Sequence, residues 1–308
     1  MVNITKKENE QRCCIMINEK IEIARINFAR RSHKHVDVNW QFQEGIELIE
    51  KAYRQLGESL AVGWSAGQCS TVVLHMALQV NPKIKVVLND TTVLYPQDYE
   101  YVKTVCSKFG IEHQLSITKP VKPFWDCIKE YGLPTIRRAY YHMDRNRRSF
   151  QEKRGKPACC WFCKDKPFLL WAKANNVKGT LTGLRACESR ARQYYAADYG
   201  TEHFTKRQNM WKFNPILFWT TKQIKEYFIE HNIPQNKVYT ELGLPRNGCQ
   251  PCTGFLSWEK QLAKTNLKMY RYIQSLRGQK MIDMYNNDLE RENELVDNCV
   301  KESVETII

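Results

Sequence analysis

The feature that most constrains the fold is a regular alternation of short apolar runs and amphipathic segments, which begins at Leu60. The apolar runs are typical of strands, and the amphipathic segments place apolar residues at the three- and four-residue spacing of a helix. The expected strands are 60–64, 83–88, 112–117 and 179–184, and the expected helices are 70–80, 97–109, 166–174 and 220–230. This order predicts an α/β fold with a parallel twisted sheet and helices on both faces. Ligands then bind beyond the carboxyl ends of the strands, near the point where the strand order reverses.

Helical patterns flank this alternation on both sides. The chain has 308 residues, which is enough for one large domain with appendages. Residues 17–28 and 42–56 have helical spacing, and the sequence after residue 258 is helical and charged. We therefore predict a helical, basic N-terminal extension over 1–57, an α/β domain over 58–258, and a helical C-terminal extension and tail over 259–308.

The charge balance favours an anionic partner. The formal net charge is +14, which suits nucleic acid or small substrates rich in phosphate and sulfate, although a basic surface without such a partner is also possible. The segment from Arg137 to Lys156 holds eight Lys or Arg residues against two acidic ones, interleaved with aromatic residues. We interpret it either as a solvated loop or as a segment that binds phosphate or nucleic acid.

The cellular setting follows from what the sequence lacks. No run approaches the length of about 18 apolar residues that a membrane span needs, and the N-terminus has no secretory signal pattern. We therefore expect a cytoplasmic protein without a membrane partner. In a reducing cytosol the twelve cysteines are expected to bind metal, react or lie buried rather than form a disulfide scaffold.

Four of these cysteines form two tight pairs, Cys159-Cys160 and Cys249-x-x-Cys252. Two short thiol pairs that a fold brings together make a four-thiolate site, which suits an iron–sulfur cluster or zinc. Cys163 is an alternative ligand, because Cys160-x-x-Cys163 is itself a metal-binding spacing. Buried free thiols or disulfides remain the other interpretation.

A turn rich in small residues follows the first expected strand and runs directly into a helix. It reads Ser65-Ala66-Gly67-Gln68-Cys69-Ser70-Thr71. Such a turn presents backbone N–H groups and a helix N-terminus to an anion, and three hydroxyl side chains add donors. An ordinary strand-to-helix turn is the alternative.

This turn resembles the PP-loop, Ser-Gly-Gly-Lys-Asp-Ser, of the adenine nucleotide α-hydrolase-like fold. Four later segments resemble, in the same order, those of the phosphoadenosine phosphosulfate reductase family within that fold. They are Asn89–Val102, Leu181–Arg192, Asn214–Trp219 and Arg246–Cys252. The resemblance covers residues 58–258, and the cysteine pattern looks most like the adenylyl-sulfate reductases that carry a [4Fe–4S] cluster.

The resemblance implies roles for named residues. The implied cluster ligands are Cys159, Cys160, Cys249 and Cys252, with zinc as the alternative metal, and Lys164 would lie between cluster and substrate. The implied nucleotide-binding residues are Ser65, Ala66, Gly67, Gln68, Ser70, Thr71, Asp90, Gly183, Arg185, Glu188 and Arg192. Asp90 would hold a ribose hydroxyl or cap a turn, and Arg185 and Glu188 could equally form an internal salt bridge.

The chain departs from the family pattern at its candidate catalytic residues. Gln68 and Cys69 replace the lysine and aspartate of the PP-loop, which weakens an ATP-cleaving function. The family's C-terminal Glu-Cys-Gly-x-His tail, whose thiolate attacks the sulfonucleotide, is absent, and Cys299 is the candidate in its place. Cys69 is a second candidate nucleophile, because a thiol at a helix N-terminus is expected to have a lowered pKa. Each of these two thiols has a purely structural alternative.

Three functions are compatible with these observations. The first is a reductase or sulfur-transfer enzyme that binds adenylyl sulfate, phosphoadenylyl sulfate or ATP beside the cluster, with a thioredoxin-like reductant. The second is a PP-loop sulfurtransferase that modifies tRNA or DNA. The third is a non-catalytic nucleotide-binding module with a degenerate loop. We favour the first, although fold alone does not fix function.

Overall fold

The computed structural model describes residues 38–134, 156–255 and 257–279. The chain divides into two compact units, of which the first runs to Glu130 and continues from Lys156 to Cys249. The second comprises Tyr131 to Gly155 and the residues from Gln250 onward. Within the described ranges, no helix is both long and apolar enough for a membrane crossing.

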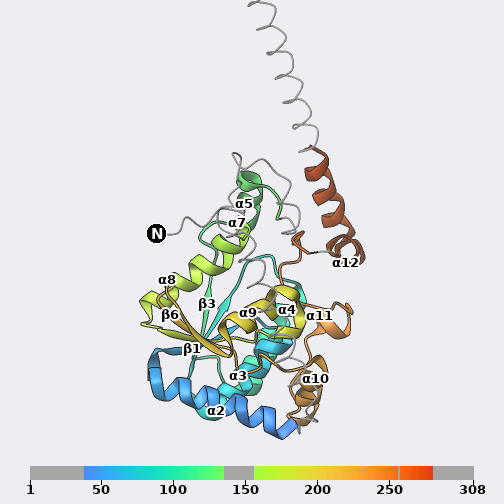
Figure 1. Cartoon of the computed structure of the whole chain (residues 1–308). Helices are drawn as coiled ribbons and strands as arrows, with labels where there is room; N and C mark the ends of the chain where they lie inside the picture. The colour runs from blue at the N-terminus through green and yellow to red at the C-terminus, as the bar shows by residue number, and fades with distance from the viewer. Residues whose placement is uncertain (1–37, 135–155, 256, 280–308) are drawn as a thin grey trace, which may run out of the picture. The chain divides into compact units, whose positions relative to one another are not determined.

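A six-stranded sheet forms the centre of the first unit (Figure 1). Its strands are β1 (Leu60–Trp64), β2 (Lys85–Asn89), β3 (Leu115–Thr118), β4 (Gly179–Leu181), β5 (Glu202–Thr205) and β6 (Met210–Phe213). They lie in the order β3-β2-β1-β4-β6-β5, and every neighbouring pair is parallel except the antiparallel β5–β6 hairpin. The strand order reverses between β1 and β4, so the switch point of the sheet lies where these two strands end.

Nine helices lie in the described part of this unit. They are α2 (Val38–Leu56), α3 (Gln68–Val80), α4 (Pro96–Phe109), α5 (Phe124–Tyr131), α7 (Ala158–Cys160), α8 (Lys166–Ala174), α9 (Arg190–Tyr199), α10 (Thr221–Glu230) and α11 (Lys237–Thr240). Local sequence sets their ends. Thr220 and Gln223 form a capping box at the start of α10, and Gly110 (φ 65°) ends α4 in the left-handed conformation.

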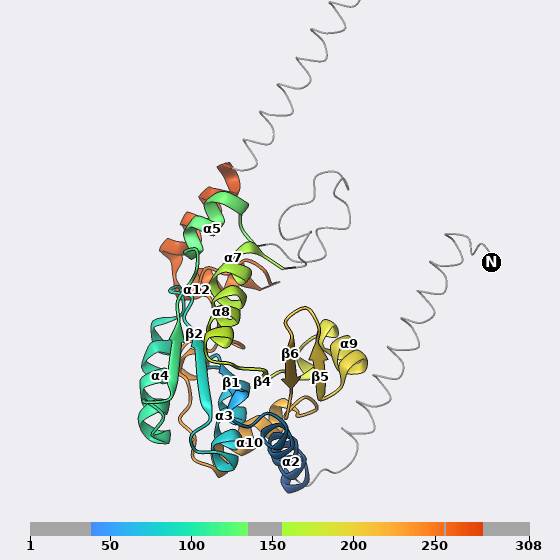
Figure 2. The same cartoon turned by 90° about the vertical axis from the view of Figure 1, so that its left-hand side faces the viewer.

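The two faces of β1 enter different cores because side chains alternate along a strand. Leu60, Val62 and Trp64 pack in the main core with residues of α2, α3, α4 and α10. Ala61 faces the other way and packs with Ala172 of α8. Figure 2 shows α4 and α8 on opposite sides of β2. The centre of the sheet is therefore buried on both faces.

The second unit contains α12 (Trp258–Thr265) and a helical stretch over 267–279. Arg277 lies 5.1 Å from the ring of Trp258 and bonds to Glu259 at 2.9 Å, which holds the two helical stretches together. Thr253 donates a hydrogen bond to the carbonyl of Pro134 at 2.5 Å.

The predicted α/β fold is confirmed, and so are the eight predicted strands and helices between 60 and 230. Three differences stand out. The strand expected over 179–184 ends at Leu181, the β5–β6 hairpin was not predicted, and a π-helical turn (Trp161–Asp165) joins α7 to α8. The predicted domain boundaries stay predictions. The helix at 17–28, nearly all of the basic segment 137–156, and Cys299 lie outside the described residues.

Candidate functional site

Two loops meet at the switch point of the sheet. The β1 loop (residues 65–71) comprises the turn after β1 and the first turn of α3, and the β4 loop (residues 182–189) leads into α9. A Cβ atom added at Gly183 would lie 2.5 Å from the backbone nitrogen of Ser70 and 2.6 Å from the carbonyl carbon of Cys69. Only glycine permits this approach, so Gly183 brings the two loops into contact.

The β1 loop uses its own hydroxyl groups to hold its shape. Ser70 and Thr71 both donate to the carbonyl of Gly67, at 3.0 and 2.9 Å, and the Ser65 N–H donates to the Ser70 hydroxyl at 3.2 Å. Ala66 has a positive φ of 57°, which is uncommon for a residue with a side chain. Ser70 and Thr71, predicted as donors to an anion, are therefore buried and engaged inside the loop.

Three residues that sequence analysis did not identify support this loop through its backbone carbonyl groups. Asn247 donates to the carbonyl of Ser65 at 2.8 Å, and Asn236 donates to the carbonyl of Ala66 at 3.1 Å. Both asparagines also donate to the buried carboxylate of Asp98. No local signal marked them, because Asp98 looks like an ordinary acidic residue in the first turn of α4.

Arg185 organises the β4 loop. Its Nε donates to Cys69 Sγ at 3.0 Å, and one terminal nitrogen donates to Cys187 Sγ at 3.2 Å and to the carbonyl of Trp219 at 3.4 Å. The other terminal nitrogen lies 3.5 Å from Glu188, and only 6% of the residue is exposed. The internal salt bridge allowed for by the sequence is thus present, and Arg185 fixes side chains of both loops.

The predicted low pKa of Cys69 is wrong. Burial raises the pKa of this thiol, and the nearby Arg185 guanidinium offsets that effect only in part. The contacts agree with a neutral thiol, since Cys69 Sγ lies 3.4 Å from a carboxylate oxygen of Glu188, to which it donates. The raised pKa therefore favours the neutral thiol form of Cys69 at neutral pH.

Positive charge gathers beside the two loops. Arg192, in the first turn of α9, is half-exposed and pairs with Glu188. Burial, followed by the neighbouring guanidinium groups of Arg246 and Arg185, lowers the pKa of Arg192. The guanidinium groups of Arg246 and Arg185 thus both lie within electrostatic range of Arg192, an arrangement that favours an anion.

Gln68 and Asp90 have protein partners. Gln68, which stands in place of the PP-loop lysine, donates to Gln235 at 3.2 Å. Asp90 accepts from the N–H of Thr92 and from the Tyr99 hydroxyl, both at 2.8 Å, and pairs with Lys119 at 2.6 Å. Burial acts to raise the pKa of Asp90, but these donors together hold it below its usual value. The turn-capping interpretation of Asp90 is thus supported by direct contacts.

Several cysteines of the first unit lie near one another. A hydrogen bond from Cys159, together with Lys164, lowers the pKa of Cys160 against the opposing effect of burial. Cys163 is buried and donates to the carbonyl of Lys122 at 3.5 Å. Burial, and then charges on Cys127, Cys249 and Cys160, raise its pKa, so these thiols lie within electrostatic range of Cys163. Lys164 lies within electrostatic range of both Cys160 and the side chain of Asp98.

The remaining predicted ligands are placed as follows. Cys249 Sγ donates to the Thr91 hydroxyl at 3.4 Å, and Cys252 belongs to the second unit. Across the described ranges, no three His, Cys, Asp or Glu side chains are arranged as a metal site. The donor set is nevertheless suitable for a thiophilic metal, because it contains a thiol whose pKa is lowered and neighbouring thiols on separate segments.

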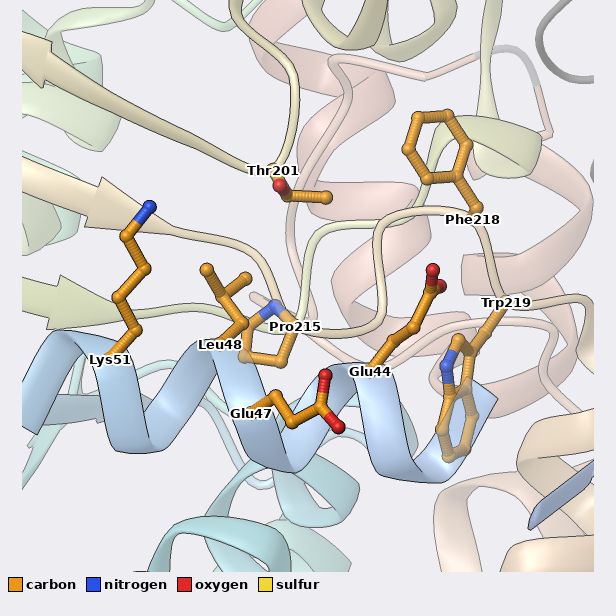
Figure 3. Close-up of a pocket in the computed structure, with 8 residues that line it drawn as sticks. All are labelled: Glu44, Glu47, Leu48, Lys51, Thr201, Pro215, Phe218 and Trp219. Atoms are coloured by element: carbon orange, nitrogen blue, oxygen red, sulfur yellow. The ribbon is translucent and has the colours of Figure 1, made fainter. Parts of the chain in front are cut away.

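A separate pocket of about 270 Å³ lies against α2 (Figure 3). It is lined by Glu44, Glu47, Leu48, Lys51, Thr201, Pro215, Phe218 and Trp219. Two carboxylates in its wall make it unsuitable for a phosphate or sulfate ester. The two loops at the switch point are therefore the better candidate site.

Comparison with known proteins shows which family this sequence matches. The model of the phosphoadenosine phosphosulfate reductase domain family matches residues 59–255, which is more than half of the chain. Adenosine 5'-phosphosulfate reductase of Salinibacter ruber is 24% identical over 211 residues, which cover 67% of this chain and 72% of that protein. The enzyme of the same name from Bacillus cereus is 28% identical over 209 residues, covering 68% and 79%.

A solved structure shares the fold. The crystal structure of phosphoadenylyl-sulfate reductase from Candida auris, a phosphate complex, matches with a TM-score of 0.50 and 19% identity. The match covers 82% of this chain and 98% of that one. At this identity the likeness speaks for the fold alone.

Proposed function

Because this chain belongs to the phosphoadenosine phosphosulfate reductase family, we propose that it binds a sulfonucleotide where β1 and β4 end and reduces it to sulfite. The observation that carries the proposal is the contact between a backbone turn of anion-binding type and the β4 loop, which holds Arg185 and leads to Arg192. The names of the two bacterial relatives favour adenylyl sulfate as the substrate.

The chemistry needs two thiols. A cysteine thiolate attacks the sulfur of the sulfonucleotide, the bond between sulfur and the phosphate oxygen breaks, and AMP or its 3'-phosphate leaves. A thiol of a thioredoxin-like reductant then attacks the cysteine sulfur, so that sulfite departs with the bonding electron pair and a disulfide remains. The two thiols together supply the two electrons that the reduction requires.

The residues of the site suit the binding part of this reaction. Backbone N–H groups of the β1 loop and Arg192 would hold the phosphate and sulfate oxygens, and Arg185 would keep the two loops together. The absence of a lysine at Gln68 does not hinder this reaction, because the phosphate bonds of the nucleotide stay intact. Cys299 is the proposed nucleophile, whereas Cys69 is less suited because its pKa is raised and its thiol is held by Arg185 and Glu188.

An activity assay tests the proposal. Protein purified without oxygen, supplied with thioredoxin and either adenylyl sulfate or phosphoadenylyl sulfate, is expected to release sulfite and the matching nucleotide. Cys299→Ser should lower turnover at least about a hundredfold and leave AMP binding unchanged, and Cys14→Ser is the matched cysteine control. AMP binding without sulfite from either substrate would instead indicate a nucleotide-binding module.

The cysteine pattern supports a further part of the proposal, a [4Fe–4S] cluster on Cys159, Cys160, Cys249 and Cys252. Cys163 is the alternative ligand and zinc the alternative metal. A cluster would join the two cysteine segments and exchange electrons, which zinc cannot do.

Metal analysis under argon, with an absorption spectrum, tests this part. Iron with equal inorganic sulfide is expected, and Cys160→Ser and Cys249→Ser should each lower the iron content. Cys106→Ser is the control, because Cys106 packs in the main core. Zinc without sulfide would contradict the cluster.

Binding of nucleic acid through 137–156 stays a prediction, which a salt-dependent gel shift with tRNA or duplex DNA checks.

A further inference from the structure

Asp98 is a carboxylate in an unusual setting. It lies in the first turn of α4 and is fully buried. Its Oδ1 accepts from Asn236 Nδ2 at 2.7 Å and from Asn247 Nδ2 at 3.5 Å. Its Oδ2 is also buried and has no hydrogen-bond partner within the described residues. A buried carboxylate is costly, so its retention at this position needs an explanation.

The two asparagines connect this carboxylate to the β1 loop. A side-chain amide has two N–H groups and one carbonyl oxygen. Besides bonding to Asp98, the amide nitrogen of Asn236 donates to the Ala66 carbonyl and that of Asn247 donates to the Ser65 carbonyl. Each asparagine therefore links one carbonyl of the loop to the same carboxylate.

The orientation of each amide is fixed by what its oxygen accepts. Asn236 Oδ1 accepts from the N–H of Val238 at 2.9 Å, where it caps α11, and Asn247 Oδ1 accepts from the Tyr239 hydroxyl at 3.3 Å. With the oxygens committed to these donors, the nitrogens must face the loop and Asp98. An acceptor at position 98 stabilises this orientation of both amides.

The planarity of the peptide bond carries this constraint to the ligand side of the loop. In a trans peptide the C=O and the following N–H point in opposite directions. Holding the carbonyls of Ser65 and Ala66 toward the asparagines therefore turns the N–H groups of Ala66 and Gly67 the other way. The positive φ of Ala66 brings these two successive N–H groups toward the same side, which is the geometry of an anion-binding nest.

We propose that Asp98 is a positioning residue of the nucleotide site, which orients Asn236 and Asn247 so that the N–H groups of Ala66 and Gly67 face a phosphate group. This inference rests on the proposed function, because it assumes that an adenine nucleotide binds at the β1 loop. The contribution of Asp98 is geometric: it acts through the two amides and does not touch the ligand.

Comparing AMP with adenosine separates positioning from general stability. Only AMP has a phosphate for the loop, so calorimetric titration of both ligands isolates the contribution of the loop. Asp98→Ala is expected to weaken AMP binding about tenfold or more, which is the effect of losing one oriented hydrogen bond to a charged group. Adenosine affinity should change by less than about twofold.

Two further variants test the mechanism. Asp98→Asn keeps an acceptor oxygen at the same place and should restore AMP affinity to within about threefold of wild type. Asn236→Asp keeps the cap on Val238 but turns an acceptor toward the Ala66 carbonyl, so AMP binding should fall at least as much as in Asp98→Ala. Glu112→Ala, which changes an exposed acidic residue just beyond the end of the same helix, is the matched control and should bind AMP like wild type.

The outcomes separate this inference from the proposed function. Equal losses for AMP and adenosine in Asp98→Ala, or no loss for either, would overturn the inference and leave the proposed function standing. A folded wild-type protein that binds neither AMP nor adenylyl sulfate would overturn both. Should Asp98→Ala fail to fold, Asn247→Asp carries the same expectation from a half-buried position.

Discussion

The two loops at the switch point are held in contact with each other by different kinds of interaction. The β1 loop is held through its backbone carbonyls by Asn236 and Asn247, which leaves backbone N–H groups for a ligand. In the β4 loop one guanidinium group, that of Arg185, contacts two thiols, a carbonyl and a carboxylate, while backbone bonds from Thr182 and Ala186 anchor the loop to the end of β6 and the segment after it. The side chains that support the first loop belong to several residues, whereas in the second loop one residue, Arg185, makes more of the described side-chain contacts than any other. A change of Arg185 alone should therefore destabilise the β4 loop strongly, whereas a change of any single supporting residue should destabilise the β1 loop less.

The largest expected effect is that of Arg185→Ala. It removes a buried group that bonds to Cys69, Cys187 and the Trp219 carbonyl, and we expect a loss of about 3 kcal/mol in the free energy of unfolding. Arg185→Lys should recover little, because an ammonium group cannot reproduce the planar fork of donors. Urea denaturation measures both variants.

Arg192→Ala is the matched control, since Arg192 is half-exposed and pairs with Glu188. Its cost should stay below about 1 kcal/mol. If the two alanine variants lose similar stability, support of the β4 loop is not concentrated in Arg185.

The next effect tests the contact between the loops. Gly183→Ala places a methyl group against the backbone of Ser70 and Cys69, which cannot move without shifting α3. We expect about 2 kcal/mol of destabilisation and weaker AMP binding. Gly278→Ala is the control, because nothing lies within 4 Å of the added atom there and its φ is not left-handed. A Gly183→Ala protein as stable as wild type would show that the loops can separate.

A smaller effect concerns Asp90, beside the β1 loop. Its folded-state pKa is lowered, so the carboxylate contributes stability above the usual Asp range near 4 and loses it as the pH falls through the lower folded-state value. The stability difference between wild type and Asp90→Asn should therefore be largest near pH 6 and shrink progressively below about pH 4. Thermal melting from pH 7 to pH 3 measures it. A difference that grows on acidification would mean that the pKa of Asp90 is raised instead.

The smallest expected effect is chemical. Because the pKa of Cys69 is raised, its alkylation by iodoacetamide at pH 7 should be several times slower than that of free cysteine, and it should accelerate above about pH 9. Mass spectrometry of the peptide that contains Cys69 measures the rate. Rapid labelling at pH 7 would restore Cys69 as a candidate nucleophile.

The sequence predicted the elements well where pattern and burial agree. The run at 60–64 became β1 because it is apolar on both faces, and the helices after it kept their periodicity. The β5–β6 hairpin escaped prediction because its short strands, Glu202–Thr205 and Met210–Phe213, mix polar and aromatic residues. Pairing with β4 places them in the sheet, and that is a tertiary effect.

The candidate site was predictable only in part. Motifs identified Gly67, Gly183 and Arg185, because small residues and guanidinium groups at strand ends are typical of anion sites. Asp98, Asn236 and Asn247 carry no such pattern, since their role depends on three segments that meet only after folding. The pKa of Cys69 was misjudged for the same reason: burial raises it, and Arg185 and Glu188 of the β4 loop contact this thiol only after folding.

The span of the hydrogen bond between Asn247 and Ser65 has a consequence for biosynthesis. The two residues are 182 positions apart in the chain. A nascent chain that has released β1 from the ribosome still lacks Asn236 and Asn247 over most of the time needed for translation. Nucleotide is therefore expected to bind only to chains extended past residue 247. Nucleotide binding would then follow folding of the domain rather than initiate it.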